Sequence, residues 1–423
     1  MSERPQLRAT RASAVSRRRV LVVGAAGAVG AAVALAGQSA EQPGRPHVPV
    51  DPTKVQGPGA SDIGARSPFE QPRRVSLNQR RTSSQTPLQD LEGIITPSDL
   101  HFERHHGGVP AIDPTRYSLL IHGMVERPLI FTLEDLKRFP ARSIIRSVEC
   151  SGNGGRAYRN EDISPHLTPQ QIDGLTSTSE WTGVPVATLF REAGASAKAE
   201  WFLAEGMDAA MLTRSIPMVK AYDDALIVYA QNGEALRPEQ GYPARLFLPG
   251  FEGSSSVKWI RRLELAAEPF MTREETSKYT DPLPDGTARI FSLVMDAKSI
   301  ITEPAYPDRL TGPGWWEIRG LAWTGRGRIT QVDVSVDGGK TWHAATLDEP
   351  VLPKCHTRFR YAWDWKGGEA VLMSRATDET GYVQPTLEVL MAARGPATAY
   401  HFNNIRAWRV AQSGAVTFAG GGA

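Results

Sequence analysis

The hydrophobic pattern of the chain changes near residue 286, and this change limits the folds that are open to it. Before that point, short apolar runs of strand length alternate with helical segments and turns. Beyond it, Ile329–Val336 alternates valines with polar residues, as a strand with one buried face does. The Gly-Gly hairpin signal Asp337–Lys340 follows directly. We therefore expect an α+β domain over about 91–285 and a β-sandwich over 286–423.

Individual elements can be assigned within both domains. Thr132–Phe139 predicts a helix with Thr132 as its N-cap and Asp135 three residues later, and Val186–Ala193 predicts a helix that stops at Gly194. The remaining apolar runs predict strands: Arg116–Met124, Ser143–Cys150, Ala225–Ala230, Ala244–Leu248, Trp315–Trp323 and Ala370–Ala376. No helical pattern is convincing between residues 313 and 395. An immunoglobulin-like sandwich is the simplest arrangement of those C-terminal strands, although its hallmark disulfide is absent.

Composition and charge exclude some classes of protein. Of 423 residues, 41% are hydrophobic and 22% charged, which excludes a wholly disordered chain. The net charge of +2 comes from six arginines within the first 40 residues, so the rest is near neutral and its charge gives no reason to expect nucleic-acid binding. Two cysteines, Cys150 and Cys355, exclude a disulfide-dense scaffold, while one disulfide between them stays open.

The N-terminus has the layout of an export signal. Arg17 and Arg18 precede the uncharged stretch Val20–Ala36, which ends in the small-x-small sequence Ala34-Leu35-Ala36. The paired arginines resemble the twin-arginine signal for folded proteins, so we expect a signal peptide at 1–40 and a periplasmic location. The alternative is a membrane anchor, for which 17 glycine-rich residues are short. Residues 41–90 are rich in Pro, Gly and Ser and predict a surface tail.

The segment most indicative of chemistry is Val148–Gly155. Its cysteine, Cys150, ends a predicted strand, and the small residues after it let the backbone approach a ligand closely. A thiolate is a soft ligand that suits a thiophilic metal. One thiolate cannot hold an ion firmly, so the other ligands would come from an organic cofactor. The alternative is a buried structural cysteine, which is the commoner case for an isolated cysteine.

An ordered set of motifs across residues 94–410 resembles the sulfite oxidase family of molybdenum enzymes. The motifs are Phe102-x-Arg104-His105-His106, Cys150-x-Gly152-Asn153, Trp181-x-Gly183-Val184, Glu205-Gly206-x-Asp208, Ser215-Ile216-Pro217, Gly241–Arg245, Val257–Trp259, Ser335–Trp342 and Gly381–Pro385. The resemblance implies a molybdopterin-binding domain followed by an immunoglobulin-like dimerisation domain. It also implies molybdenum held by a pyranopterin and by Cys150 as the protein ligand. No haem-binding CxxCH motif is found.

The resemblance assigns roles to particular residues. Arg104, Cys150 and Tyr279 fall on the catalytic positions, where Arg104 would stabilise anionic oxygen and Tyr279 would donate a hydrogen bond. The positions expected to bind the cofactor are Phe102, Arg104, His106, Cys150, Asp208, Ser215, Arg245 and Lys258. Without the family pattern, Arg104 is more simply a surface ion pair and Tyr279 a core phenol.

Several segments, including Thr213–Met218 and Arg273–Thr280, resemble the sulfane dehydrogenases within this family. Gly154 and Gly155 stand where sulfite oxidases carry two arginines, which Arg156 could only partly replace, and Gln240 stands in place of a pterin-binding histidine. No tryptophan precedes Trp181 by ten residues. A pocket that is less cationic and less bulky attracts a small dianion less.

The expected function is therefore oxidation of thiosulfate-derived sulfane sulfur on a carrier protein, with electrons passing to a c-type cytochrome subunit. The resemblance also implies a homodimer or heterotetramer through the C-terminal domain. Two alternatives remain open from the sequence: a sulfite dehydrogenase that oxidises free sulfite, and a non-catalytic exported binding module.

Overall fold

A computed structural model describes residues 54, 56–77, 80, 82–158, 164–283 and 285–421. The expected signal peptide at 1–40 and the first part of the expected tail lie outside this range. The chain divides into two compact units, Met1–Ala65 and Arg66–Ala423. The described residues of the first unit are exposed, and Ser61 Oγ donates to Ile63 O at 3.1 Å. None of the helices in the described residues is long and apolar enough to cross a membrane.

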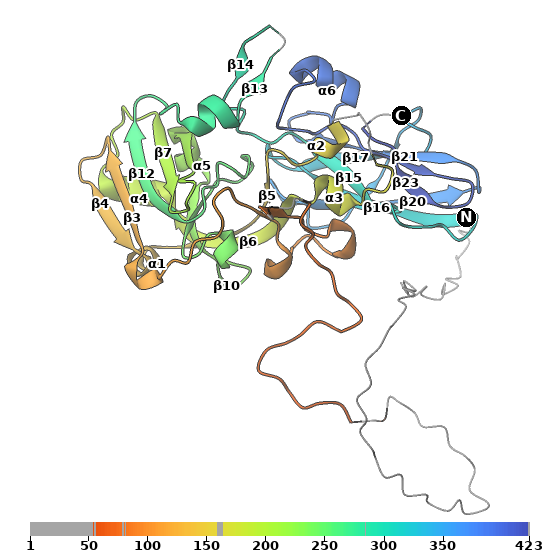
Figure 1. Cartoon of the computed structure of the whole chain (residues 1–423), viewed down its shortest axis with the longest axis horizontal. Helices are drawn as coiled ribbons and strands as arrows, with labels where there is room; N and C mark the ends of the chain where they lie inside the picture. The colour runs from red at the N-terminus through yellow and green to blue at the C-terminus, as the bar shows by residue number, and fades with distance from the viewer. Residues whose placement is uncertain are drawn as a thin grey trace, which may run out of the picture. The chain divides into compact units, whose positions relative to one another are not determined.

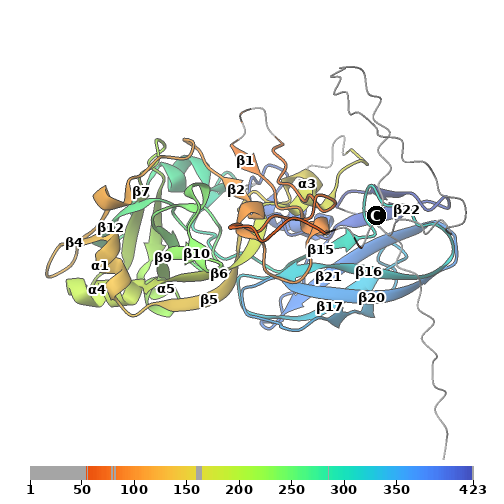
Figure 2. The ribbon, with the colours of Figure 1, turned by 90° about the horizontal axis from the view of Figure 1, so that it is seen from below.

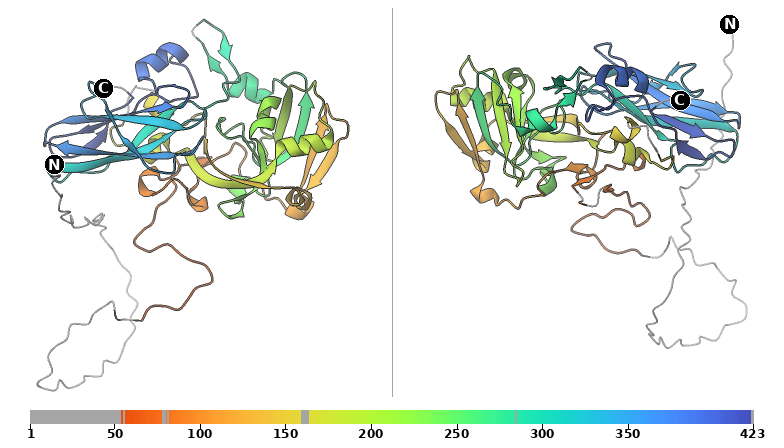
Figure 3. Two further views of the ribbon diagram at one scale, coloured as in Figure 1. Left: turned by 180° about the vertical axis from the view of Figure 1, so that it is seen from behind. Right: turned by 45° about the horizontal axis from the view of Figure 1, so that its top comes forward.

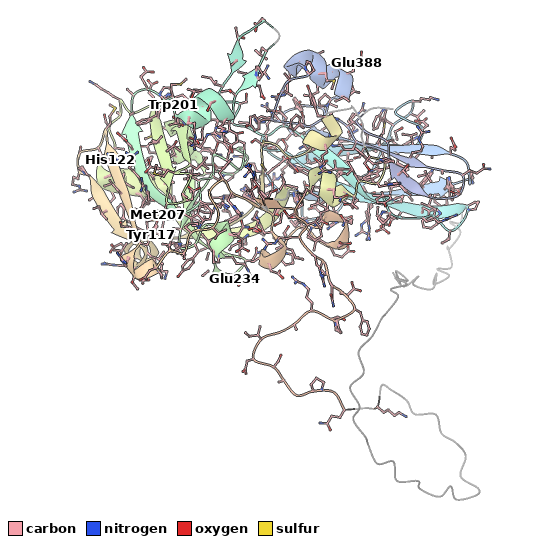
Figure 4. All side chains as sticks on the ribbon, viewed as in Figure 1. Tyr117, His122, Trp201, Met207, Glu234 and Glu388 are labelled. Carbon is pink, nitrogen blue, oxygen red and sulfur yellow. The ribbon has the colours of Figure 1, made fainter. Side chains whose placement is uncertain are left out.

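Two sheets form the first domain of the larger unit (Figure 1). One has the strand order β4-β3-β12-β7-β8, with bounds Leu129–Thr132, Ser118–Gly123, Ile260–Ala266, Trp201–Gly206 and Thr213–Pro217. The other has the order β10-β9-β6-β5, with bounds Glu234–Ala235, Leu226–Gln231, Thr176–Pro185 and Arg142–Glu149, and β11 (Arg245–Phe247) also pairs with β9. Their shared core is apolar; for example, Tyr117, labelled in Figure 4, is buried and donates its hydroxyl to Ile260 O at 2.8 Å.

The helices of this domain begin and end at residues that favour helix caps. Helix α1 (Leu133–Arg138) begins with the expected capping box between Thr132 and Asp135. Helix α4 (Val186–Ala193) ends at Gly194, whose φ of 67° is the left-handed conformation that glycine adopts readily. Both helices expected from the sequence are therefore confirmed, and the predicted strands appear with shifts of one or two residues at their ends.

The C-terminal domain is a β-sandwich (Figure 2). One sheet has the order β15-β16-β20-β19, with bounds Lys298–Glu303, Gly314–Trp323, Thr357–Trp365 and Thr346–Leu347. The other has the order β18-β17-β21-β22-β23, with bounds His343–Ala344, Ile329–Ser335, Ala370–Asp378, Ala407–Val410 and Val416–Phe418. Val332 and Val334 are fully buried between the sheets, as their alternation predicted. Asp333 and Ser335 are buried as well, so the exposed polar face that the alternation also predicted is not seen there.

Helix α6 (Leu387–Arg394) corrects the expectation that the segment 313–395 holds no helix. Thr386 caps it by accepting the Val389 backbone N–H. The helical pattern is weak in the sequence, because the helix is short and exposes Val389 within its apolar run. Figure 3 shows α6 next to the strand pair β13 (Asp281–Pro282) and β14 (Ala288–Arg289), and Arg394 of α6 lies 3.5 Å from Asp281.

The last residues of the expected tail also differ from the prediction. Strand β1 (Ser83–Ser84) pairs with β2 (Glu103–Arg104), and Thr86 and Leu88 are buried. Thr86 packs with the first domain, where its hydroxyl lies 2.6 Å from Ser177 Oγ, whereas Leu88 belongs to the apolar core built mainly by the C-terminal domain.

Candidate active site

A cavity in the first domain is lined by most of the residues that the sequence singled out. Its lining includes Phe102, Arg104, His106, Cys150, Asp208, Arg245, Lys258 and Tyr279 from the prediction, together with His101, Glu103, His105, Val148, Leu212, Gln240, Gly253, Ser254, Ser256 and Trp259.

Cys150 directly follows strand β5, and its sulfur is a free thiol. Its backbone N–H donates to Leu175 O, and its carbonyl accepts from Asn153 N, which closes the turn after the strand. Burial raises the pKa of the thiol, while the Gly152 N–H and the Arg104 charge oppose that rise. In the described part of the chain, no three His, Cys, Asp or Glu side chains converge as a metal site.

Arg104 reaches the cavity from β2, which is held in place by β1. Ser83 pairs with Arg104 and Ser84 with Glu103, and His105 N donates to Thr82 O at 3.0 Å. The guanidinium of Arg104 donates to the His105 carbonyl. A cation is thereby fixed in the same cavity as the thiol.

Tyr279 follows the π-helical turn η6 (Glu274–Lys278). The guanidinium of Arg214 packs on its ring at 4.6 Å and is itself bound to Glu252 at 2.6 Å. The Tyr279 hydroxyl lies 3.4 Å from His106 Nε2. Burial, followed by nearby negative groups, raises the pKa of Tyr279 above its ordinary value, so the phenol stays protonated and can donate a hydrogen bond.

Arg245 and Lys258 supply positive charge deeper in the cavity wall. Arg245 donates to Ser256 O at 2.7 Å and Lys258 to Glu239 O at 2.9 Å, so both bind carbonyls rather than carboxylates. Burial lowers the pKa of Arg245 to about 9, and burial together with Arg245 lowers the pKa of Lys258 to about 7. Arg245 is buried and Lys258 is half-buried, and among the described residues no carboxylate forms an ion pair with either. This arrangement favours an anionic ligand, because its charge would offset their repulsion.

The polar wall fits the pyranopterin phosphate that the sequence implies. His101 is buried, and its Nε2 has no protein partner within the described residues, so it can accept a hydrogen bond. Asp208 is buried and also faces the cavity. Gln240 also lines the cavity, and its side-chain amide donates to Phe102 O at 2.8 Å. Donors, acceptors and cations are all present for a ligand with a phosphate and a polar ring.

Ser215 is the one predicted cofactor residue outside the cavity lining. Its hydroxyl accepts the Phe270 N–H at 3.0 Å, and its own N–H donates to Glu275 at 3.0 Å. It is completely buried, so its polar groups are used within the protein. The prediction that Ser215 contacts the cofactor is therefore not supported by its position.

The residues after Asn153 also lie outside the lining of the cavity. A Cβ on Gly154 would lie 2.3 Å from Arg406 Nη2, and one on Gly155 would meet the Phe402 ring at 3.0 Å. Arg156 is exposed and does not line the cavity, so it does not replace the two arginines of sulfite oxidases.

Several residues that pack against the cavity-lining side chains were not identified from the sequence. Arg214 lies inside the motif Thr213–Met218, but the sequence did not identify it as a site residue. Its role becomes apparent only from its burial beside Glu252 and Glu275. Tyr400 stacks near Tyr279 with ring centroids 5.0 Å apart. It comes from a segment distant in sequence, and no local pattern could have identified it. Cys355 is buried beside Thr178 and is a free thiol, so no disulfide joins it to Cys150.

Comparison with known proteins agrees with this arrangement. A family model for the oxidoreductase molybdopterin binding domain matches residues 106–274, and one for the Mo-co oxidoreductase dimerisation domain matches residues 289–407. The crystal structure of the sulfane dehydrogenase SoxCD from Paracoccus pantotrophus matches with a TM-score of 0.81 and 44% identity, covering 86% of this chain and 97% of that chain.

Curated relatives extend the similarity. Sulfite oxidase from Gallus gallus is 30% identical over 376 residues, which cover 81% of this chain and 80% of that protein. An NADH nitrate reductase from Phaseolus vulgaris is 31% identical over 316 residues, which cover 67% of this chain and 35% of the nitrate reductase. The chain thus spans about a third of the length of such nitrate reductases.

Proposed function

The chain belongs to the sulfite oxidase family of molybdopterin oxidoreductases, and from this premise we propose that it oxidises sulfane sulfur bound to a carrier protein. The observation that carries the proposal is one cavity that unites a free thiol at Cys150, a cation at Arg104 and a protonated phenol at Tyr279. These groups suit a redox metal and an oxygen-bearing sulfur substrate.

Each side chain has a distinct task in the proposed reaction. When bound at Cys150, the molybdenum cofactor would supply the two-electron chemistry. Arg245 and Lys258 would hold its phosphate, and Arg104 would stabilise negative charge that develops on substrate oxygen. Tyr279 would orient the substrate by donating a hydrogen bond from its hydroxyl, held in place by Arg214 beneath its ring.

The choice of sulfane over sulfite rests on charge. Arg245 and Lys258 bind carbonyls, and a Cβ on Gly154 or Gly155 would meet Arg406 or Phe402 of the C-terminal domain. Arg104 is then the arginine that remains beside Cys150 and Tyr279 in the described lining. A single cation attracts a free dianion less than a cluster does, which favours a substrate presented on a larger carrier. The similarity to a sulfane dehydrogenase supports the same choice.

The proposal includes a location and partners. The paired arginines ahead of Val20–Ala36 support twin-arginine export to the periplasm. Electrons would pass to a c-type cytochrome subunit, because the sequence offers no CxxCH motif of its own. The match to a dimerisation domain supports a homodimer or a heterotetramer built through residues 289–407.

Steady-state kinetics separate the proposal from its main alternative. The full chain with its cytochrome acceptor would be assayed with free sulfite and with a carrier protein loaded with thiosulfate-derived sulfane. We expect a much larger kcat/KM on the loaded carrier. Efficient turnover of free sulfite would instead establish a sulfite dehydrogenase, the alternative that the Gallus gallus relative supports.

A further inference from the structure

Four buried charges lie directly behind the Cys150 loop, where the two domains of the larger unit meet. Glu149 and Asp173 belong to the first domain, and Lys298 and Arg406 belong to the C-terminal domain. Lys298 Nζ lies 2.5 Å from Glu149 and 3.6 Å from Asp173, and Arg406 Nε lies 2.9 Å from Asp173. Each side chain is at most 3% exposed, and the two acids balance the two bases.

This charge cluster is hydrogen-bonded to residues on both sides of Cys150. Glu149, immediately before Cys150, accepts hydrogen bonds from Lys298 at 2.5 Å, Trp323 Nε1 at 2.7 Å and Asn153 Nδ2 at 3.0 Å. Lys298 also donates to Asn153 O at 3.2 Å. Since Asn153 N donates to Cys150 O, both ends of the turn that presents the sulfur are fixed by the same lysine.

The C-terminal domain reaches the loop at further points. His401 N donates to Ser151 O at 2.8 Å, and Arg406 fills the space against Gly154, where an added Cβ would lie 2.3 Å from its Nη2. Gly154 has a φ of 87°, which a residue with a side chain rarely adopts. The glycine is thus required for Arg406 to pack against the loop.

We infer that Lys298 is a positioning residue, through which the C-terminal domain sets the place of the Cys150 sulfur. This inference rests on the proposed role of Cys150 as the metal ligand. Buried ion pairs contribute little net stability compared with apolar residues, because desolvation offsets their attraction. The ion pairs restrict the geometry of the loop instead. An ammonium group with three hydrogen-bond donors admits fewer arrangements of its partners than an apolar contact does.

The test measures the thiol itself, in the full chain purified without cofactor. Iodoacetamide labels accessible thiols, and peptide mass spectrometry separates Cys150, which lines the cavity, from Cys355, which is 1% exposed. Replacing Lys298→Met should speed labelling of Cys150 by about tenfold, which corresponds to a local opening made about 1.4 kcal/mol easier. The far-ultraviolet circular dichroism should stay unchanged.

Lys220→Met is the matched control. Lys220 is also a buried lysine with two carboxylates nearby, Asp224 at 2.5 Å and Asp223 at 3.9 Å, and it donates to Pro249 O at 2.7 Å. Among the described residues it forms no ion pair or hydrogen bond with the Cys150 loop. Its replacement should leave Cys150 labelling within about twofold of wild type, since local opening is confined to the perturbed region. Equal acceleration by both variants, or none by Lys298→Met, would overturn the inference.

A neutral double variant covers the case in which Lys298→Met does not fold. Glu149→Gln with Lys298→Met removes one charge of each sign and leaves no unpaired ion. We expect this protein to fold and still to label faster at Cys150 than wild type, because Asn153 has lost its link to β15. Labelling as slow as wild type would refute the positioning role. If the proposed metal binding were wrong, molybdenum would also be absent from wild type and from every variant when they are purified with the cofactor supplied, while these labelling differences in the cofactor-free proteins persisted.

Discussion

At the scale of single residues, the burial of a charged side chain and its partners within the protein indicate whether a ligand is needed to offset its charge. Arg214 and Lys298 are buried with carboxylates in contact, so the protein satisfies them internally. Arg245 and Lys258 are held by carbonyls, and Lys258 loses so much hydration that its pKa falls to about 7. A cation that is desolvated but not neutralised is the side chain on which cofactor retention should depend.

Replacing Lys258→Met should weaken binding of the cofactor phosphate by about tenfold or more, because a charge-assisted hydrogen bond is lost. The measurement is molybdenum and pterin per chain after gel filtration. Arg237→Met, which removes an exposed arginine paired with Glu234, should retain the wild-type content. Full retention in the Lys258 variant would show that the phosphate lies elsewhere.

His356 makes stability depend on pH. It is buried, its Nε2 lies 2.9 Å from Thr176 Oγ1, and burial lowers its pKa from the ordinary 6.5 to about 3. The folded protein thus favours the neutral ring. The neutral ring contributes its full stabilisation to the fold when the pH is above the pKa of this histidine in the unfolded chain. That stabilisation is lost as the pH falls from about 6.5 toward 3, because the unfolded chain takes up the proton first.

Between pH 7.5 and pH 5, this one histidine should lower the free energy of unfolding by about 2 kcal/mol. His356→Gln should therefore flatten the pH dependence of denaturant unfolding over that range, whatever its effect on stability at neutral pH. His343→Gln, at an exposed position on β18, serves as the control and should keep the wild-type slope. An unchanged slope in the His356 variant would contradict the assignment.

At the scale of elements, two helices have the same capping box but different roles. In α1 the box joins Thr132 and Asp135 on the surface, and neither residue lines the cavity. In α3 (Pro169–Asp173) it joins Thr168 and Gln171, and the helix delivers the buried Asp173 to Arg406 and Lys298. The same local chemistry thus supports stability in one place and the Cys150 loop in the other.

Thr132→Ala and Thr168→Ala should each cost about 1 kcal/mol of stability, the usual value of an N-cap. Only Thr168→Ala should also lower molybdenum content, because Asp173 then holds its place less firmly. Chemical denaturation and metal analysis on the two proteins provide the comparison. Equal metal content in both would mean that α3 does not influence the site.

The elements also show what the sequence can predict. The capping box of α1 and the Gly194 stop of α4 are local signals and were confirmed, whereas α6 was missed because an eight-residue helix with an exposed Val389 has weak periodicity. The pairing of β1 with β2 could not be anticipated. Such short strands carry no period, and their partner is chosen by tertiary contact.

At the scale of the whole molecule, the site is the product of both domains of the larger unit. Arg104, Cys150 and Tyr279, which the motifs singled out, line one cavity, and their predicted action on the ligand stays a prediction. Ser215 belongs to a motif, but its position shows a structural use. Lys298 lies 149 residues beyond Glu149, and no sequence pattern links residues that meet only when two domains pack.

The measurement that tests the central claim most directly is X-ray absorption at the molybdenum edge of the full chain and of two variants. If Cys150 holds the metal, Cys150→Ser should show one sulfur neighbour fewer around molybdenum, while Cys355→Ser should match wild type, because Cys355 is buried beside Thr178. An unchanged number of sulfur neighbours in Cys150→Ser, or purified wild-type protein that carries no molybdenum, would contradict the account.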